Sequence, residues 1–101
     1  MDPKEFLKLN PIVHAPIRLA VLSILISVDN ANFSYLKEAT GSSDGNLSTH
    51  LSKLEASGYI AIEKKFVGKK PQTLCSITSA GKEALLQHIA QLETIIAAQK
   101  E

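Results

Sequence analysis

The chain has 101 residues, enough for one domain with a modest core, and 45% are hydrophobic and 21% charged, as in ordinary folded proteins. Its one cysteine, Cys75, excludes a disulfide framework within the chain and a Cys-x-x-Cys metal or redox pair. The net charge is only +1, yet the stretch from Lys53 to Lys82 has a balance of +4, which leaves −3 for the remainder. Such an asymmetry indicates a local surface that faces a polyanion.

The sequence contains no pattern typical of export or of membrane insertion. Met1–Glu5 lacks the basic-then-apolar layout of a signal peptide. The longest nearly apolar stretch, from Leu19 to Val28, is too short to span a bilayer. We therefore expect a cytoplasmic protein that has no membrane partner.

Two prolines punctuate the first part of the chain. Asn10 followed by Pro11 is typical of a helix cap and a first helical position, and Pro16 either interrupts that helix or begins a second one. From Ile17 to Val28, apolar residues recur at steps of three and four and also occur off that stripe. This pattern predicts a central helix, which the turn-forming residues 29–32 end.

Residues 34–57 have the pattern of a helix-turn-helix. A short helix ends at Gly41 and has Ser34 as its expected cap, with a brief strand closed by Phe33 as the alternative. Ser42-Ser43 then caps a second helix. Two helices joined by a glycine-containing turn of three or four residues are typical of this motif.

The remaining residues predict a β-hairpin and a long helix. Residues 59–67 and 72–77 are strand-like, turn chemistry joins them, and Thr78 caps the last helix. We expect a single domain that is mainly α with a small β-hairpin wing, a winged helix-turn-helix with a long C-terminal dimerisation helix. Its parts are an N-terminal arm over 1–15, the helix-turn-helix over 34–57, the wing over 59–77 and the C-terminal helix over 78–99.

The second helix of the pair has one apolar and one small polar face. Leu47, Leu51 and Leu54 share a stripe, and at about 100° per residue Thr49 and Ser52 fall on the opposite side. Short polar side chains permit close approach to a groove and offer donors and acceptors to base edges and phosphates. A merely solvated face more often carries Glu and Lys. The predicted contacts of this recognition helix with double-stranded DNA are Ser43, Gly45, Asn46, Ser48, Thr49, His50, Ser52 and Lys53.

The hairpin adds four lysines that suit a phosphate backbone. Lys64 and Lys65 end one strand, and Lys69 and Lys70 occupy the turn. Lysine is a flexible point charge, which positions a protein on DNA better than it reads sequence. Exposed hairpins also carry lysine for solubility alone, so these residues indicate DNA mainly because the polar helix precedes them.

The stretch from Asn46 to Ile60 resembles the recognition helix of MarR and ArsR-like winged-helix regulators, with a leucine-serine-x-x-leucine-x-x-leucine-x-x-x-glycine rhythm before a basic wing. The run from Cys75 to Leu85 resembles their strand followed by threonine-x-x-glycine-basic. The match spans about 11–96 and is closest to compact winged-helix DNA-binding domains. This resemblance implies a homodimer with the recognition helix in the major groove and the wing along the backbone.

Two departures from the family pattern alter these expectations. Lysines stand where many relatives carry an arginine at the wing tip, which argues against minor-groove reading by a stacked arginine. The metal-sensing ArsR branch needs clustered cysteine, histidine and carboxylate ligands, whereas His14, His50 and His88 are far apart in this sequence. We therefore expect no metal and no cofactor.

The last helix predicts a dimer interface. Its apolar residues follow a 4-3-4 spacing, a narrow seam of the coiled-coil type, with Leu86 and Ile95 expected to face the domain. The alternative is that this seam packs on the chain's own first helix. In a dimer, two recognition helices roughly 34 Å apart read a palindromic site. The predicted interface is Phe6, Leu9, Ile12, Leu85, Ile89, Leu92 and Ile96.

Together these patterns predict a sequence-specific transcriptional regulator, most simply a repressor that occludes a promoter. The alternative is a winged-helix protein-interaction module without DNA-binding activity, which the net charge of +1 favours. We expect no catalytic residue and no enzyme, because the sequence has no nucleophile-base pair, phosphate loop or metal motif. No effector is identifiable, and a lone cysteine between apolar neighbours, such as Cys75, is typically buried.

Overall fold

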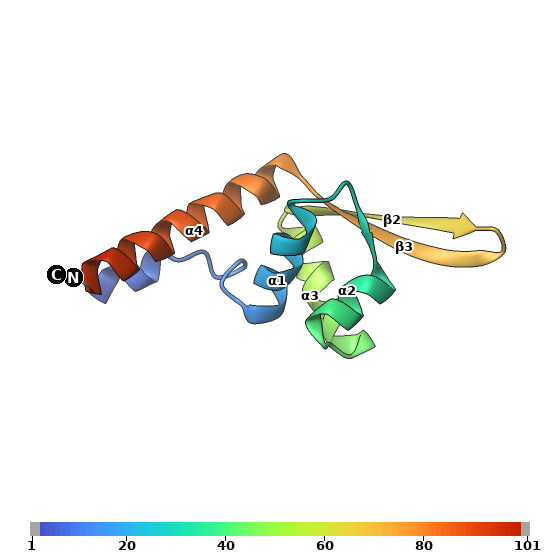
Figure 1. Ribbon diagram of the computed structural model, residues 1–101, viewed down its shortest axis with the longest axis horizontal. Helices are drawn as coiled ribbons and strands as arrows, with labels where there is room; N and C mark the ends of the chain where they lie inside the picture. Colours follow the sequence, from blue (N-terminus) through green and yellow to red (C-terminus); the bar gives the residue numbers. More distant parts are fainter. Residues whose placement is uncertain (1–2, 100–101) are drawn as a thin grey trace.

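The computed structural model describes residues 3–99 and has the predicted order of helices and hairpin (Figure 1). Residues 1 and 2 of the expected arm and the last two residues lie outside the described part. The elements are the 3-10 helix η1 (Pro3–Lys8), α1 (Pro16–Leu25), β1 (Ala31–Asn32), α2 (Phe33–Thr40), α3 (Asp44–Ala56), β2 (Ile60–Val67), β3 (Lys70–Ile77) and α4 (Ser79–Gln99).

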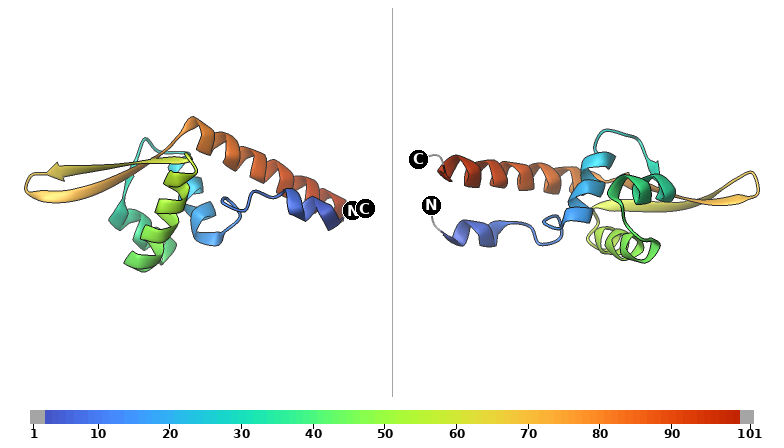
Figure 2. Two further views of the ribbon diagram at one scale, coloured as in Figure 1. Left: turned by 180° about the vertical axis from the view of Figure 1, so that it is seen from behind. Right: turned by 60° about the horizontal axis from the view of Figure 1, so that its bottom comes forward.

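The molecule is elongated, with extents of 58 × 26 × 21 Å. The hairpin of β2 and β3 projects from one end, α4 extends from the other, and α1, α2 and α3 form the body between them (Figure 1). Figure 2 shows η1 running alongside the far end of α4. The arm therefore lies at the end of the molecule opposite the hairpin.

The first α-helix begins at Pro16, which occupies the first turn, where a missing N–H costs nothing. The predicted helix start at Asn10-Pro11 is wrong. The Asn10 side-chain oxygen accepts hydrogen bonds from the backbone N–H groups of Ile12 (2.9 Å) and Val13 (3.2 Å), so it caps a turn instead.

The caps of the helix pair are local and mostly as predicted. Gly41 ends α2 with φ of 66°, a conformation that favours glycine, and the Ser43 hydroxyl accepts from the Asn46 N–H at 3.2 Å at the start of α3. Asn32 and not Ser34 caps α2, since its side-chain oxygen accepts from the Tyr35 N–H at 2.7 Å. Asn32 also belongs to β1, so strand and cap share one residue.

The sheet has the order β1-β3-β2 and is antiparallel throughout. Residue 60 pairs with 77 and 67 with 70, so the hairpin turn consists of Gly68 and Lys69 alone, shorter than predicted. Gly68 has φ of 65°, as the first central position of a type II′ turn requires. Pro71 lies within β3, at a level where β1 does not pair with that strand and no ladder N–H is needed.

The core lies where α1, α2, α3, the base of the hairpin and the start of α4 meet. Leu22, Leu36 and Leu54 are fully buried there. Cys75 is buried as predicted, and burial, followed by the charge of Glu55, raises the pKa of its thiol to about 11. The thiol is therefore protonated at neutral pH and has a packing role.

The end of α3 and the start of α4 meet at one joint, formed by Gly58, Tyr59, Thr78 and Gly81. The Thr78 N–H donates to the Tyr59 carbonyl (3.0 Å), and the Thr78 hydroxyl donates to the Gly58 carbonyl (2.6 Å) and accepts from the Gly81 N–H (3.0 Å). A Cβ at Gly81 would overlap the Tyr59 carbonyl, so only glycine permits this approach. Thr78 is thus confirmed as the cap of α4.

Candidate nucleic-acid interface

Helix α3 is oriented as its sequence pattern predicts. Leu47, Leu51 and Leu54 are buried and bring α3 against α1 and β2. Thr49 and Ser52 are exposed on the opposite side. Of the predicted contact residues, Ser43, Gly45, Asn46, Ser48, Thr49, Ser52 and Lys53 are exposed, and His50 is half-buried.

The outer face of α3 is small and carries hydroxyl groups. A shallow hollow of about 430 Å³ is lined by Ser48, Thr49, Ser52, Lys53 and Ala56. The Thr49 hydroxyl donates to the Gly45 carbonyl at 3.0 Å, which leaves its oxygen available as an acceptor. Apart from Lys53, the side chains that line the hollow are short, so it offers donors and acceptors at a surface that a partner can approach closely.

The structure brings one of the two lysines of β2 to this helix, and it places Lys70, predicted in the turn, at the start of β3. A cavity of about 440 Å³ between α3 and the hairpin is lined by residues that include Ser48, Ser52 and Lys64. Because side chains alternate along a strand, Lys65 lies on the other face, where its ammonium is 3.5 Å from the Glu63 carboxylate. Lys64 and Lys65 are thus on opposite sides of the wing.

The same cavity contains a carboxylate that the sequence reasoning overlooked. Glu55 is exposed and lines it beside Ser52 and Lys64. A carboxylate here repels phosphate and accepts hydrogen bonds, for example from a cytosine amino group. Glu55 is therefore a further candidate for contact with bases. Its helical spacing from Ser48 and Ser52, which places the three on one side of α3, could have indicated this from the sequence.

Arg18 is a second residue that the sequence analysis missed. It is almost fully buried, and it donates to the carbonyls of Ile12 (2.6 Å) and Pro11 (3.3 Å) and to Nδ1 of His50 (2.9 Å). Arginine only donates, so His50 Nδ1 is an acceptor and the ring proton is on Nε2. Burial, then the charges of Arg18 and Lys53, lower the pKa of His50. His50 therefore presents a neutral ring with a fixed tautomer.

The predicted dimer residues fall into three groups by their exposure. Phe6, Ile89 and Ile96 are exposed, and Leu9, Ile12 and Leu92 are half-buried, with Ile12 packed against the core. Leu85 is only 1% exposed, so its assignment to the interface is wrong.

The adjacent residues of α4 explain that error. Leu86, which was expected to face the domain, is 57% exposed, whereas Ile95 faces inward as predicted. Apolar residues occur around most of this helix, and spacing alone does not tell which of two neighbours meets the core. The exposed apolar edge of α4 is therefore Leu86, Ile89 and Ile96.

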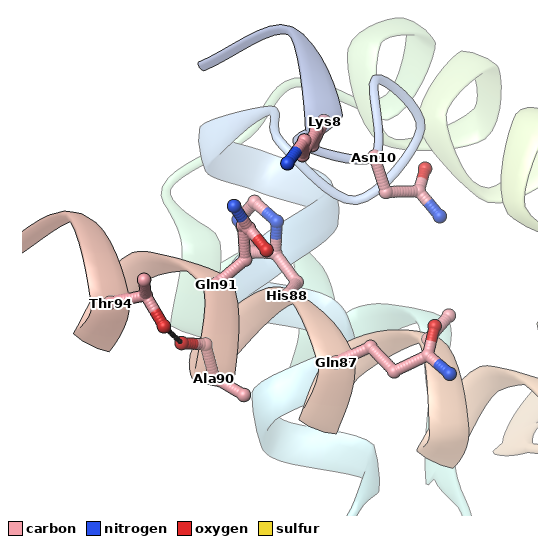
Figure 3. A pocket seen from close by; sticks show the side chains of 8 residues that line it. Lys8, Asn10, Gln87, His88, Ala90, Gln91 and Thr94 are labelled. Carbon is pink, nitrogen blue, oxygen red and sulfur yellow. Dashed lines mark hydrogen bonds between the residues drawn. The ribbon is translucent and has the colours of Figure 1, made fainter. Parts of the chain in front are cut away.

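Two histidines that are far apart in sequence meet in space. His14 Nδ1 and His88 Nε2 are 3.3 Å apart. His88 also lines a cavity of about 350 Å³ between η1 and α4, together with residues that include Lys8, Asn10 and Gln91 (Figure 3). Burial, then the charge of His14, lowers the pKa of His88. Over residues 3–99, no three His, Cys, Asp or Glu side chains are grouped as a metal site, and no helix has the length and apolar character to cross a membrane.

Comparison with known proteins gives a consistent set of similarities. The model of a family described as winged helix DNA-binding domain matches residues 17–96. An uncharacterized protein of Methanocaldococcus jannaschii is 32% identical over 81 residues, which cover 80% of this chain and 88% of that protein.

Solved structures show the same architecture. A transcriptional regulator homologue from Pyrococcus horikoshii OT3 has a TM-score of 0.86 and 28% identity, with 97% of this chain and 96% of that chain covered. A MarR family transcriptional regulator from Silicibacter pomeroyi has a TM-score of 0.67 and 19% identity, with 82% of this chain and 55% of that chain covered. This second likeness concerns the fold.

Proposed function

Because this chain belongs to the winged helix DNA-binding domain family, as its resemblance to MarR and ArsR-like regulators predicted, we propose that it is a sequence-specific, double-stranded DNA-binding transcriptional regulator. The observation that carries the proposal is the exposed polar face of α3 with Lys64 beside it. In this arrangement α3 enters the major groove and reads base edges through Ser48, Thr49 and Ser52.

The wing supplies the sequence-independent part of the binding. Lys64, Lys65, Lys69 and Lys70 are all exposed on the hairpin. Lysines that neutralise phosphates release counterions, so binding weakens steeply as salt rises. Lys65 contributes least in this scheme, because Glu63 already partly neutralises it.

A homodimer fits the exposed apolar edge of α4. Leu86, Ile89 and Ile96 leave apolar surface in water on a helix whose other side is buried in its own domain. A second copy that packs there presents two recognition helices to a palindromic site. Such a dimer acts most simply as a repressor, since it occludes a promoter that contains its site.

Selection of bound sequences from random DNA, followed by titration of the enriched duplex, tests the function. We expect a palindrome, and binding that Ser52→Glu abolishes. Ser79→Glu adds the same charge at the start of α4, away from the face of α3, and should leave binding intact. Loss of binding in both variants, or no enrichment at low salt, would contradict the proposal.

The salt dependence separates this function from its alternative. If wing lysines contact phosphates, Lys69→Ala and Lys70→Ala should each reduce the slope of log affinity against log salt by about 0.9. A protein-interaction module should instead bind a partner with little salt dependence and without competition from nonspecific DNA. The carboxylate of Glu55 within the polar cavity is the feature that favours that module.

A further inference from the structure

The end of the wing carries apolar side chains that the proposed phosphate contacts do not use. Phe66 is 77% exposed and Val67 is 61% exposed, and they are the last two residues of β2 before the turn. The hairpin projects away from the body at this point (Figure 1), so these side chains add nothing to the core. Exposed lysines flank them, at 64 and 65 on β2, at 69 in the turn and at 70 on β3.

Phe66 lies on the same face of the hairpin as α3. Alternate residues of a strand share a face, so Phe66 follows Ile60, Ile62 and Lys64 along one row. Ile60 is buried in the core, and Lys64 lines the cavity beside α3. Phe66 therefore continues the α3 side of the molecule about 7 Å farther out than Lys64, at two strand steps. Val67 lies on the opposite face.

A second apolar residue stands directly across the hairpin from Phe66. The strand register pairs Phe66 with Pro71, which is exposed, and residues directly opposite each other share a face. Phenylalanine and proline are among the side chains that wedge between base pairs from the minor groove, usually next to lysines or arginines. The tip of the wing has both components.

We propose that Phe66, with Pro71 beside it, inserts between base pairs from the minor groove and bends the duplex that α3 reads. The inference rests on the proposed DNA binding and names the role of the wing tip within it. Lys64, in the same row as Phe66, holds a phosphate next to the inserted ring, and burial of the ring offsets the cost of unstacking.

The charges around Phe66 argue for DNA against a second protein chain as its partner. A contact between two wings would bring two sets of four lysines together with only Glu63 on each hairpin to compensate. A polyanion removes that repulsion, and the minor groove next to a docked α3 lies on the side that Phe66 faces.

Fluorescence of 2-aminopurine, placed in turn at each step of the selected duplex, detects unstacking, and energy transfer between dyes at the duplex ends reports the bend. For the wild-type protein we expect enhanced fluorescence at one step in each half-site and a bend of roughly 20–90°. Phe66→Ala should lose both signals and about tenfold in affinity, with an unchanged salt slope because no charge is altered.

Two variants serve as controls. Val67→Ala removes an apolar group from the opposite face of the same tip and should keep unstacking and bending. Phe66→Leu retains a wedge-forming side chain and should restore part of both signals. The inference would be overturned if Phe66→Ala unstacked and bent the duplex as much as the wild-type protein does. A change in the oligomeric mass of the Phe66→Ala variant would also overturn it. A wild-type protein that binds no DNA would instead refute the proposed function itself.

Discussion

Arg18 and His50 are joined by a hydrogen bond of 2.9 Å that ties the start of α1 to the middle of α3. The same guanidinium holds the carbonyls of Pro11 and Ile12, so one side chain fixes the loop before α1 and the ring on the recognition helix. The position of α3 thus depends on a polar anchor as well as on its leucines.

Replacing this anchor should destabilise the fold. Arg18→Met retains much of the apolar stem but leaves two carbonyls and the His50 nitrogen without their donor, so we expect a loss of about 2 kcal/mol in the free energy of unfolding. Urea denaturation measures it. Lys82→Met changes an exposed cation on α4 and should stay within about 0.5 kcal/mol of wild type. Equal stability of Arg18→Met and wild type would show that the anchor is energetically neutral.

Alanine substitutions at two helical glycines should change the stability of the protein in opposite directions. Gly81→Ala forces a methyl group against the Tyr59 carbonyl and should destabilise the protein by about 1–3 kcal/mol. Gly45 has open space around it, so Gly45→Ala should stabilise α3 by about 0.5 kcal/mol while its methyl group weakens DNA binding. Thermal unfolding measures the stability of both variants, and duplex titration measures the DNA affinity of Gly45→Ala. Tighter DNA binding by Gly45→Ala would contradict a close approach of α3 to the groove.

The exposed edge of α4 predicts a dimer that a single charge disrupts. Ile89→Asp places a carboxylate in the middle of that edge, and sedimentation should show a shift from dimer to monomer, because an unpaired charge is costly to bury. Thr94 is exposed on a different side of the same helix, where it lines the cavity beside η1, and Thr94→Asp serves as the control for an added charge on α4. Dimers of both variants would place the interface elsewhere.

The pH dependence of stability should report on His88. The pKa of His88 is below its ordinary value of 6.5 in the folded protein, so the unfolded chain binds more protons just below that pH. The stabilising contribution of His88 to the free energy of unfolding is therefore complete above pH 6.5, and it is lost as the pH falls toward the pKa of His88 in the folded protein. His88→Gln should lose less stability than wild type between pH 7.5 and 5.5 in urea titrations. An NMR titration of the His88 ring near 6.5 would refute this expectation.

The sequence predicted the features of this fold that are local. Gly41, Ser43 and Thr78 cap or end a helix through groups within one helical turn of their own position, although Thr78 also bonds to Gly58 and Tyr59. The orientation of α3 was equally accessible, because its apolar stripe is narrow. The brief strand before the helix pair was predicted only as an alternative that Phe33 would close. Strand β1 in fact ends at Asn32, and its pairing could not be predicted because its ladder partners lie more than 40 residues away in β3.

The long-range polar contacts escaped prediction for a similar reason. A lone arginine in an apolar helix is usually exposed, and nothing near Arg18 in the sequence indicates that His50 comes to meet it. The same holds for His14 and His88, which are 74 residues apart and become neighbours only when α4 folds back along the arm. The error at Leu85 has a different origin, an apolar helix with too broad a stripe.

The joint at Gly58, Tyr59, Thr78 and Gly81 connects the proposed recognition helix, α3, with the proposed dimer helix, α4. Thr78 forms hydrogen bonds with the carbonyls of Gly58 and Tyr59, and the Tyr59 carbonyl packs against Gly81. These contacts couple the direction of α3 to the direction of α4. In a dimer, the geometry of this joint would then determine the distance between the two α3 helices along the DNA. A change confined to it would alter which operator length is accepted, while every side chain that meets a base stays the same.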